Sequence, residues 1–326
     1  MKIFIYGFRE EERSYVEACK ERYQLDIGCS TQRPTIENAN LANGYTCISM
    51  LSTPMEEACI NALYENGVRY LSTRTIGYDH IDLLACQKIG MHVGNATYAP
   101  QSVADYTIML LLMSLRKMKL ILKSAEIQDY SFDRVVGQNL KGKCVGVIGT
   151  GAIGTTLLHH LRGFECNLLA YSRHEKESLA SFVTYTDLTS LLQQSDIITL
   201  HIPLQEETYH MIDEKAFALM KQGVVLINTA SGALIDNQAL IHAIETGKVA
   251  SAALDVVEGE KGIYYSNKKG DLLIQHEMAV LNSFPNVLMT PHMAFLTEDS
   301  YRDMIVHSIQ SCILYMEHKD NPWQIQ

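Results

Sequence analysis

A glycine-rich turn in the middle of the chain has the residue types and the spacing that bind a dinucleotide. An apolar run, Cys144 to Ile148, ends in Gly149-x-Gly151-x-x-Gly154 and passes into a helix-like stretch. Gly149 permits a tight turn, Gly151 lets the backbone approach a pyrophosphate, and Gly154 allows the helix to pack on the strand. The N-terminus of this helix adds unpaired N–H groups that favour a phosphate. We expect a nucleotide site here, and the alternative is a glycine turn that is needed only for packing.

The end of the next expected strand, Asn167 to Tyr171, bears on the type of dinucleotide. An NAD site favours Asp or Glu at this point, where the carboxylate binds the ribose hydroxyls. This chain has Ser172 and Arg173 instead. A hydroxyl and a guanidinium would hold a 2′-phosphate, which a carboxylate would repel. We therefore expect NADP(H) rather than NAD(H). Two alternatives stay open: NAD(H) as the cofactor, and an arginine that is merely solvated.

Strand-like and helix-like segments alternate along almost the whole chain, as they do in parallel sheets. The pattern predicts the α/β class, with two doubly wound parallel-sheet domains, Rossmann-like or flavodoxin-like, and a cleft between them. A long helix is expected over residues 101–127, and another over residues 297–318 that returns to the first domain. We expect a discontinuous substrate (catalytic) domain of residues 1–98 and 295–326, and a dinucleotide-binding Rossmann domain of residues 99–294.

Composition narrows the class of protein further. The chain has 326 residues, 47% of them hydrophobic, and a net charge of −10. This charge argues against nucleic-acid or anionic-membrane binding as a main role, and the longest apolar run is too short to span a bilayer. The eight cysteines form no CxxC pair, which is typical of reduced thiols in the cytoplasm, and no metal-ligand spacing is present.

Taken together, these segments resemble the D-isomer-specific 2-hydroxyacid dehydrogenase family nearly from end to end. Within the family they are most similar to the D-lactate dehydrogenases of vancomycin-resistance operons. The segments that carry the resemblance are residues 72–82, 102–107, 145–154, 161–164, 170–173, 252–256 and 290–292.

The resemblance implies two residues for proton transfer. His292 follows an expected strand and Pro291, at the edge of the sheet where doubly wound folds bind ligands. It matches the family's acid/base, and Glu260 matches the carboxylate that pairs with that histidine and favours the imidazolium. Without the resemblance, His292 is one of twelve histidines, Glu260 is a solvated loop glutamate, and Glu258 is expected at the surface.

The resemblance also implies the binding residues. The substrate carboxylate is expected at the backbone of Ile76 and Gly77, in the loop after Arg74, with Tyr98 closing the pocket. The expected cofactor residues beyond the glycines and the Ser-Arg pair are Ala152, Ile153, His201, Pro203, Thr229, Ala230 and Asp255. A glycine turn, a core aromatic residue and ordinary strand ends are the alternatives for these positions.

One position departs from the family. The family has an arginine before a glycine at a strand end, where it binds the substrate carboxylate; here Ser231 precedes Gly232. A neutral hydroxyl cannot replace a charged, planar guanidinium. Loss of one such group typically costs about 3–4 kcal/mol of transition-state stabilisation. Three explanations are open: an engineered variant that traps a complex, a natural homologue that uses another cation such as Arg74, or a weak enzyme kept for cofactor-dependent binding.

The function implied by the resemblance is NAD(P)H-dependent reduction of a small 2-keto acid, with pyruvate to D-lactate favoured and activity impaired at Ser231. The alternative is a non-catalytic NAD(P)H-binding regulatory protein of the same fold. The family also implies a cytoplasmic homodimer, with residues 108–115 as its interface.

Overall fold

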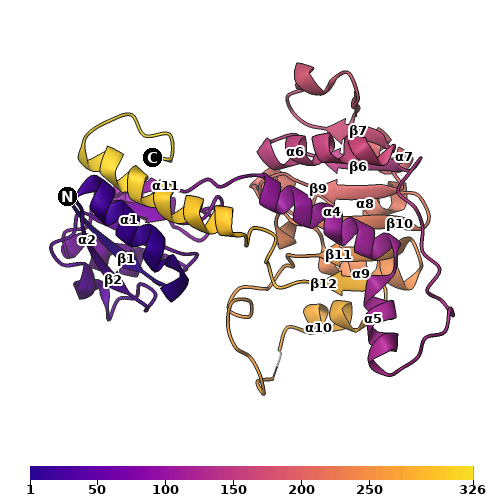
Figure 1. Cartoon of the computed structure of the whole chain (residues 1–326), viewed down its shortest axis with the longest axis horizontal. Coiled ribbons are helices and arrows are strands. Elements are labelled where there is room, and N and C mark those ends of the chain that lie inside the picture. The colour runs from indigo at the N-terminus through magenta and orange to yellow at the C-terminus, as the bar shows by residue number, and fades with distance from the viewer. Residues whose placement is uncertain (273, 326) are drawn as a thin grey trace. The chain divides into compact units, whose positions relative to one another are not determined.

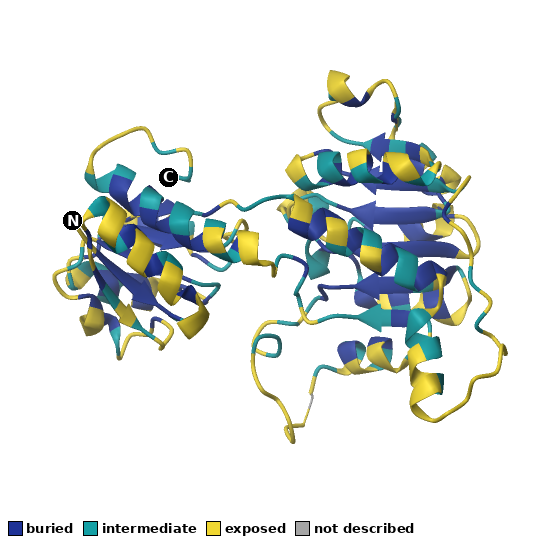
Figure 2. Cartoon of the chain, in the orientation of Figure 1, coloured by how far each residue is buried: buried dark blue, intermediate teal, exposed yellow. Residues whose placement is uncertain are grey.

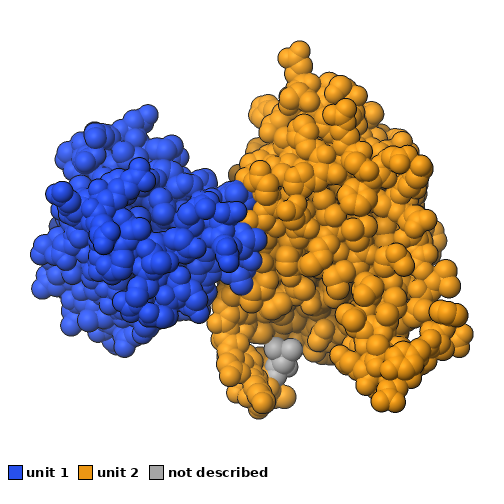
Figure 3. All heavy atoms as spheres, in the orientation of Figure 1, with its two compact units in different colours: residues 1–99, 296–326 blue, residues 100–295 orange. Residues whose placement is uncertain are grey.

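Two compact units make up the molecule. The computed structural model describes residues 1–272 and 274–325, and the contacts within it separate residues 1–99 with 296–326 from residues 100–295 (Figure 3). Each unit contains one sheet of parallel strands. The first unit is therefore built from two stretches of chain that lie far apart in the sequence.

The first unit has a five-stranded sheet in the order β2-β1-β3-β4-β5, which is the flavodoxin-like order. Its strands are β1 (Lys2–Tyr6), β2 (Asp26–Ser30), β3 (Cys47–Met50), β4 (Tyr70–Thr73) and β5 (His92–Gly94). Its helices are α1 (Arg13–Tyr23), α2 (Glu57–Glu65), α3 (Leu83–Ile89) and α11 (Glu298–Met316). Although α11 comes last in the sequence, it packs against β3, β4 and α1 (Figure 1).

The second unit has a seven-stranded sheet in the order β12-β11-β10-β9-β6-β7-β8, which is the Rossmann order with an added edge strand. Its strands are β6 (Cys144–Ile148), β7 (Asn167–Tyr171), β8 (Thr184–Tyr185), β9 (Ile197–Leu200), β10 (Val224–Asn228), β11 (Val249–Leu254) and β12 (Val287–Met289). Its helices are α4 (Gln101–Leu115), α5 (Met118–Glu126), α6 (Ala152–Leu161), α7 (Leu188–Gln194), α8 (Glu214–Leu219), α9 (Asn237–Glu245) and α10 (His276–Ser283).

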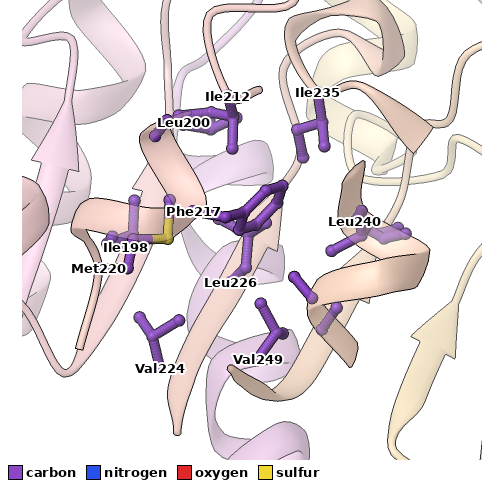
Figure 4. Packing of buried hydrophobic residues seen from close by; sticks show 14 of the residues in the cluster. Ile198, Leu200, Ile212, Phe217, Met220, Val224, Leu226, Ile235, Leu240 and Val249 are labelled. Atoms are coloured by element: carbon purple, nitrogen blue, oxygen red, sulfur yellow. The ribbon is translucent and has the colours of Figure 1, made fainter. Parts of the chain in front are cut away.

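The central strands are buried on both faces. Every residue of β3, β4, β9 and β10 is buried, as parallel sheets covered by helices require (Figure 2). On one face of the second sheet, Leu226 and Val249 pack with Phe217 and Leu240 (Figure 4). Among the described residues, no helix combines the length and the apolar character needed to cross a membrane.

Aspartate side chains begin three helices of the second unit. Asp187, Asp213 and Asp236 each accept a backbone N–H from the first turn of α7, α8 and α9. Such caps satisfy donors that have no partner within the helix.

The predicted fold class is confirmed, but one predicted helix is wrong. Residues 101–127 form two helices, α4 and α5, instead of one. Lys117 adopts the left-handed conformation, with φ of 52°, and its backbone N–H donates to Ser114. Left-handed residues end helices, and glycine is the usual signal for them. A lysine in this position does not indicate a helix end in the sequence.

Candidate active site

The candidate residues of the second unit follow the carboxyl ends of neighbouring strands. The chain winds one way from β6 to β7 and the other way from β6 to β9, and such a reversal is where doubly wound sheets bind ligands. The positions are Gly149 after β6, Ser172 and Arg173 after β7, His201 and Pro203 after β9, Thr229 to Ser231 after β10, Asp255 after β11 and His292 after β12.

The three glycines of the turn have different neighbours, and each environment is compatible with a bound pyrophosphate. Gly149 has φ of +101°, and a side chain there would collide with the carbonyl of His201. A side chain at Gly154 would collide with the carbonyl of Gly149, so this glycine lets α6 approach the strand. A Cβ atom at Gly151 would have no neighbour within 4 Å. The backbone at Gly151 therefore borders open space, as a phosphate cradle requires.

The first turn of α6 has the donors that such a phosphate needs. Gly151 is its N-cap and offers no side chain to bind the N–H groups of the turn that contains Ala152 and Ile153. Two contacts brace this turn. Tyr185 donates its hydroxyl to Thr150 at 3.3 Å, and the ammonium of Lys176 donates to Thr155 at 2.9 Å. Lys176 was not among the predicted residues, although it comes three residues after Arg173.

His201 lies beneath the glycine loop and stays uncharged at neutral pH. Burial lowers the pKa of its imidazole to about 3, because the charged form loses its hydration. The Nε2 atom lies 2.9 Å from the hydroxyl of Thr199. Pro203, two residues on, is exposed at the same edge of the sheet.

His292 and Glu260 form a close pair. The Nδ1 atom of His292 lies 2.5 Å from Glu260 Oε1, and Glu260 Oε2 accepts the backbone N–H of Val257 at 2.8 Å. The Glu260 side chain is 18% exposed and that of His292 is 37% exposed. Because the carboxylate accepts at Nδ1, proton exchange with a substrate would use Nε2.

Asp255 holds the loop that carries His292. Its carboxylate accepts the Thr290 hydroxyl at 2.6 Å and the N–H groups of Met293 and Ala294 at 2.8 and 2.9 Å. The backbone N–H of His292 donates to the Asp255 carbonyl, and His292 has φ of +56°. Burial raises the pKa of the Asp255 carboxyl, and these hydrogen bonds act in the opposite direction. We predicted Asp255 only as a cofactor residue, and its hydrogen bonds to the histidine loop were not predicted from the sequence.

Glu258 is partly exposed, with 31% of its side chain accessible, but it also makes contacts that we did not predict. Its carboxylate accepts the Tyr209 hydroxyl at 3.1 Å and lies 2.7 Å from His210 Nε2. The other ring nitrogen of His210 lies 3.8 Å from the carboxylate of Asp236. Alternate glutamates of one loop therefore pair with two different histidines.

The loop that contains Ser231 is well formed around a neutral side chain. The Asn228 amide donates to the carbonyl of Ser231 at 2.8 Å, and its oxygen accepts the N–H of Ala230 at 3.0 Å. A side chain at Gly232 would collide with the backbone of Val257, so only glycine fits there. In the part of the chain that the structure describes, the Ser231 hydroxyl makes no hydrogen bond.

The predicted carboxylate cradle lies in the first unit, after β4. Ile76 and Gly77 are exposed, and within the described residues their backbone N–H groups donate to no protein acceptor. Their carbonyls are held: Asn95 Nδ2 donates to Ile76 at 2.9 Å, and the Thr75 hydroxyl donates to Gly77 at 2.7 Å. Tyr98 is partly buried in the same unit.

Arg74 cannot serve as the substitute cation that we considered. Its side chain is 1% exposed and lies 3.6 Å from the carboxylate of Glu12. The guanidinium donates to the carbonyls of Tyr6 and Gly7 and to the hydroxyl of Ser49. The guanidinium is therefore bound inside the first unit, where its hydrogen bonds connect the ends of β1, β3 and β4.

Comparisons with known proteins give one consistent family. The sequence model of the D-isomer specific 2-hydroxyacid dehydrogenase family, NAD binding domain, matches residues 108–294. A D-specific alpha-keto acid dehydrogenase of Enterococcus faecium is 39% identical over 98% of both chains.

Solved structures agree with this family. A D-lactate dehydrogenase of Treponema pallidum superimposes with a TM-score of 0.91 at 28% identity, covering all of both chains. The NAD-complexed form of a D-isomer specific 2-hydroxyacid dehydrogenase from Lactobacillus delbrueckii ssp. bulgaricus gives a TM-score of 0.88 at 28% identity, with the same coverage.

Proposed function

The chain belongs to the D-isomer-specific 2-hydroxyacid dehydrogenase family, and we propose that it reduces a small 2-keto acid, pyruvate to D-lactate in first place, with NADP(H) preferred over NAD(H). The observation that carries this proposal is the His292–Glu260 pair, 2.5 Å apart at the carboxyl edge of a Rossmann sheet. A reductase needs an acid/base pair at this edge to protonate its substrate, whereas a protein that only binds a nucleotide does not.

His292 is the proposed acid. When bound, the nicotinamide cofactor supplies the hydride that the carbonyl carbon accepts. His292 gives a proton from Nε2 to the carbonyl oxygen as charge develops there, and takes it back in the oxidation direction. Glu260 holds Nδ1 and thereby orients the ring, while the Val257 N–H keeps the carboxylate in place.

The second unit is the proposed cofactor domain. Gly149, Gly151 and Gly154 with the first turn of α6 would hold the pyrophosphate, and Ser172 with Arg173 would hold a 2′-phosphate. Both residues follow β7 and reach solvent, so a phosphate has access to them. The remaining proposed contacts, on the nicotinamide side, are His201, Pro203, Thr229, Ala230 and Asp255.

The first unit is the proposed substrate domain. The exposed N–H groups of Ile76 and Gly77 would bind the substrate carboxylate, and Tyr98 would close the pocket. Backbone donors carry only partial charge, so this cradle is weaker than one that includes an arginine. With Ser231 at the arginine position, we expect turnover to be about 10²–10³ below that of a chain with the guanidinium.

A second candidate function rests on Ser231 itself. A neutral side chain at this position suits a non-catalytic NAD(P)H-binding regulatory protein that senses the cofactor. The braced His292–Glu260 pair weighs against this candidate, because cofactor sensing alone needs no proton donor.

We also propose a homodimer in the cytoplasm. An open groove of about 560 Å³ runs along α4, lined by Ile108, Met109, Leu112 and Met113 among others, and a second copy would cover it. The eight thiols of the chain are all unpaired, as is usual in a reducing compartment.

A turnover assay separates the two functions. NADPH oxidation is followed with pyruvate, 2-ketobutyrate and phenylpyruvate, and NADPH and NADH binding are titrated in parallel. We expect slow but substrate-dependent oxidation with at least one keto acid. Background rates with every keto acid, together with tight NADPH binding, would favour the regulatory protein.

A further inference from the structure

The segment that follows α11 pairs with an edge of the first sheet. Gln324 bridges to Gly94 in antiparallel fashion, and the Trp323 carbonyl accepts the backbone N–H of Asn95 at 2.9 Å. Asn321 anchors the start of the segment, because its amide donates to the Tyr70 hydroxyl at 3.0 Å. Residues far apart in the sequence are thus joined next to the proposed substrate cradle.

Two aromatic rings of this region contact Thr97, one at its side-chain hydroxyl and one at its backbone carbonyl. The indole of Trp323 and the imidazole of His307, on α11, stack with their centroids 4.9 Å apart. The indole N–H donates to the Thr97 hydroxyl at 3.0 Å, and His307 Nδ1 lies 2.5 Å from the Thr97 carbonyl oxygen. A carbonyl only accepts, so Nδ1 carries the hydrogen. We call Thr97, His307 and Trp323 the Thr97 clamp.

Asn95 connects this segment to the cradle. Its backbone N–H is held by Trp323, and its side-chain amide donates to the carbonyl of Ile76. A trans peptide is planar, with its C=O and N–H pointing in opposite directions. Fixing the Ile76 carbonyl therefore fixes the Gly77 N–H, which belongs to the same peptide. In the same way, His307 fixes the peptide between Thr97 and Tyr98.

We propose that the Thr97 clamp is a positioning device for substrate binding: it holds the Gly77 N–H and the Tyr98 backbone in the directions that receive the keto acid, without touching it. The proposal rests on the proposed function. Because the anion cradle consists of backbone donors and Ser231 adds no charge, binding depends on how well these donors are aligned.

Single hydrogen bonds of the clamp can be removed with little change in shape. Trp323→Phe keeps a ring on His307 but loses the N–H donor, and Thr97→Val is isosteric but loses the acceptor. We expect each variant to raise the Kd of oxamate, measured by calorimetry with NADPH saturating, and the KM of pyruvate by about three- to tenfold. NADPH affinity and kcat should stay near those of the parent protein.

Three controls separate positioning from a loss of stability. Thr97→Ser restores the acceptor and should restore the oxamate Kd. The double variant Trp323→Phe/Thr97→Val should bind oxamate no more weakly than Thr97→Val alone, because the valine already removes the bond to the indole and the 3.4 Å contact of the hydroxyl with His307 Nδ1. Gln310→Ala removes a bond of similar length from α11 to Tyr23, away from Thr97, and should leave the oxamate Kd unchanged.

Trp323 also gives a readout that does not depend on activity. It is the single tryptophan of the chain, so its emission reports on the clamp directly. Thr97→Val should shift that emission, whereas Gln310→Ala should not. Parental oxamate affinity in both Trp323→Phe and Thr97→Val would overturn the proposed positioning role. A parent protein that neither binds oxamate nor turns over a keto acid would instead refute the proposed function, and the clamp's role with it.

Discussion

Two histidine–glutamate pairs arise from one loop of the second unit, and they differ in which ring nitrogen meets the carboxylate. Glu260 contacts Nδ1 of His292, whereas Glu258 contacts Nε2 of His210. The other nitrogen of His210 faces a second carboxylate, that of Asp236, at 3.8 Å. A close histidine–carboxylate contact is therefore not by itself a general acid, because a substrate must still reach a ring nitrogen.

The two pairs also differ in what surrounds them. His292 follows β12 on a loop braced by Asp255, at the edge of the sheet where ligands bind. His210 donates its backbone N–H to Ala233, beside the Ser231 loop. The carboxylates of Glu258 and Asp236 flank the His210 ring, so this residue does not replace the positive charge that is missing at Ser231. In the proposed function, the proton-transfer pair is complete, whereas the anion-binding residues lack the arginine charge.

Matched substitutions of the two histidines test this comparison most strongly. Glutamine keeps a hydrogen-bonding group but transfers no proton. His292→Gln should lower kcat/KM for pyruvate by about 10²–10⁴, the usual contribution of general acid catalysis, with NADPH affinity unchanged. His210→Gln should stay within about threefold of the parent. Equal losses in steady-state assays of the two variants would break the comparison.

Substituting the glutamates should have a smaller effect. Glu260→Gln removes the negative charge beside Nδ1 and one acceptor for Val257, so kcat should fall by about ten- to a hundredfold. Glu258→Gln is the matched control and should change kcat little. If kcat fell as much in Glu258→Gln as in Glu260→Gln, the proposed proton-transfer role of the His292–Glu260 pair would be contradicted.

Substitutions at the end of β7 should change the choice between NADPH and NADH without affecting either histidine–glutamate pair. Ser172→Asp with Arg173→Ala removes one charge-assisted contact and adds a carboxylate. Each change is worth about 1–3 kcal/mol, so together they should lower the ratio of NADPH to NADH affinity by at least about thirtyfold. Fluorescence titration with both cofactors measures the ratio. An unchanged ratio would show that this strand end does not bind the 2′-phosphate.

A third histidine, His201, has its ring nitrogen beside a hydroxyl instead of a carboxylate. We expect its substitution to have the smallest effect, on the pH dependence of stability. Its pKa is lowered to about 3 in the folded protein, from about 6.5 when unfolded. Between these values the unfolded chain binds one more proton, so the free energy of unfolding falls as pH falls, by at most about 1.4 kcal/mol per pH unit. Urea unfolding without cofactor from pH 6.5 to 4.5 should be less pH-dependent in His201→Gln. If the free energy of unfolding had the same pH dependence in both proteins, the lowered pKa of His201 would be contradicted.

The fold class could be predicted from the sequence because the signals for it are local. The alternation of apolar strands with helices and the glycine turn are both read from a few neighbouring residues. The break at Lys117 was missed because a left-handed lysine looks like any helical lysine.

The site was only partly predictable. The roles of His292 and Glu260 came from the family resemblance, whereas the contact of Glu258 with His210 joins loops 48 positions apart and has no sequence signal. Arg74 looked available beside the cradle because sequence shows charge but not burial. The tie between Trp323 and Thr97 spans 226 positions and required the fold itself.

The most direct test of the account is to supply the missing charge. Ser231→Arg should raise kcat/KM for pyruvate by about 10²–10³ over the parent and tighten oxamate binding, because a guanidinium would act on the carboxylate and on the developing oxyanion. Ser231→Met, which is long but uncharged, is the matched control and should give no gain. Equal activity of parent and Ser231→Arg would show that other groups already hold the anion, and inactivity of both with tight NADPH binding would show that the protein is not a reductase.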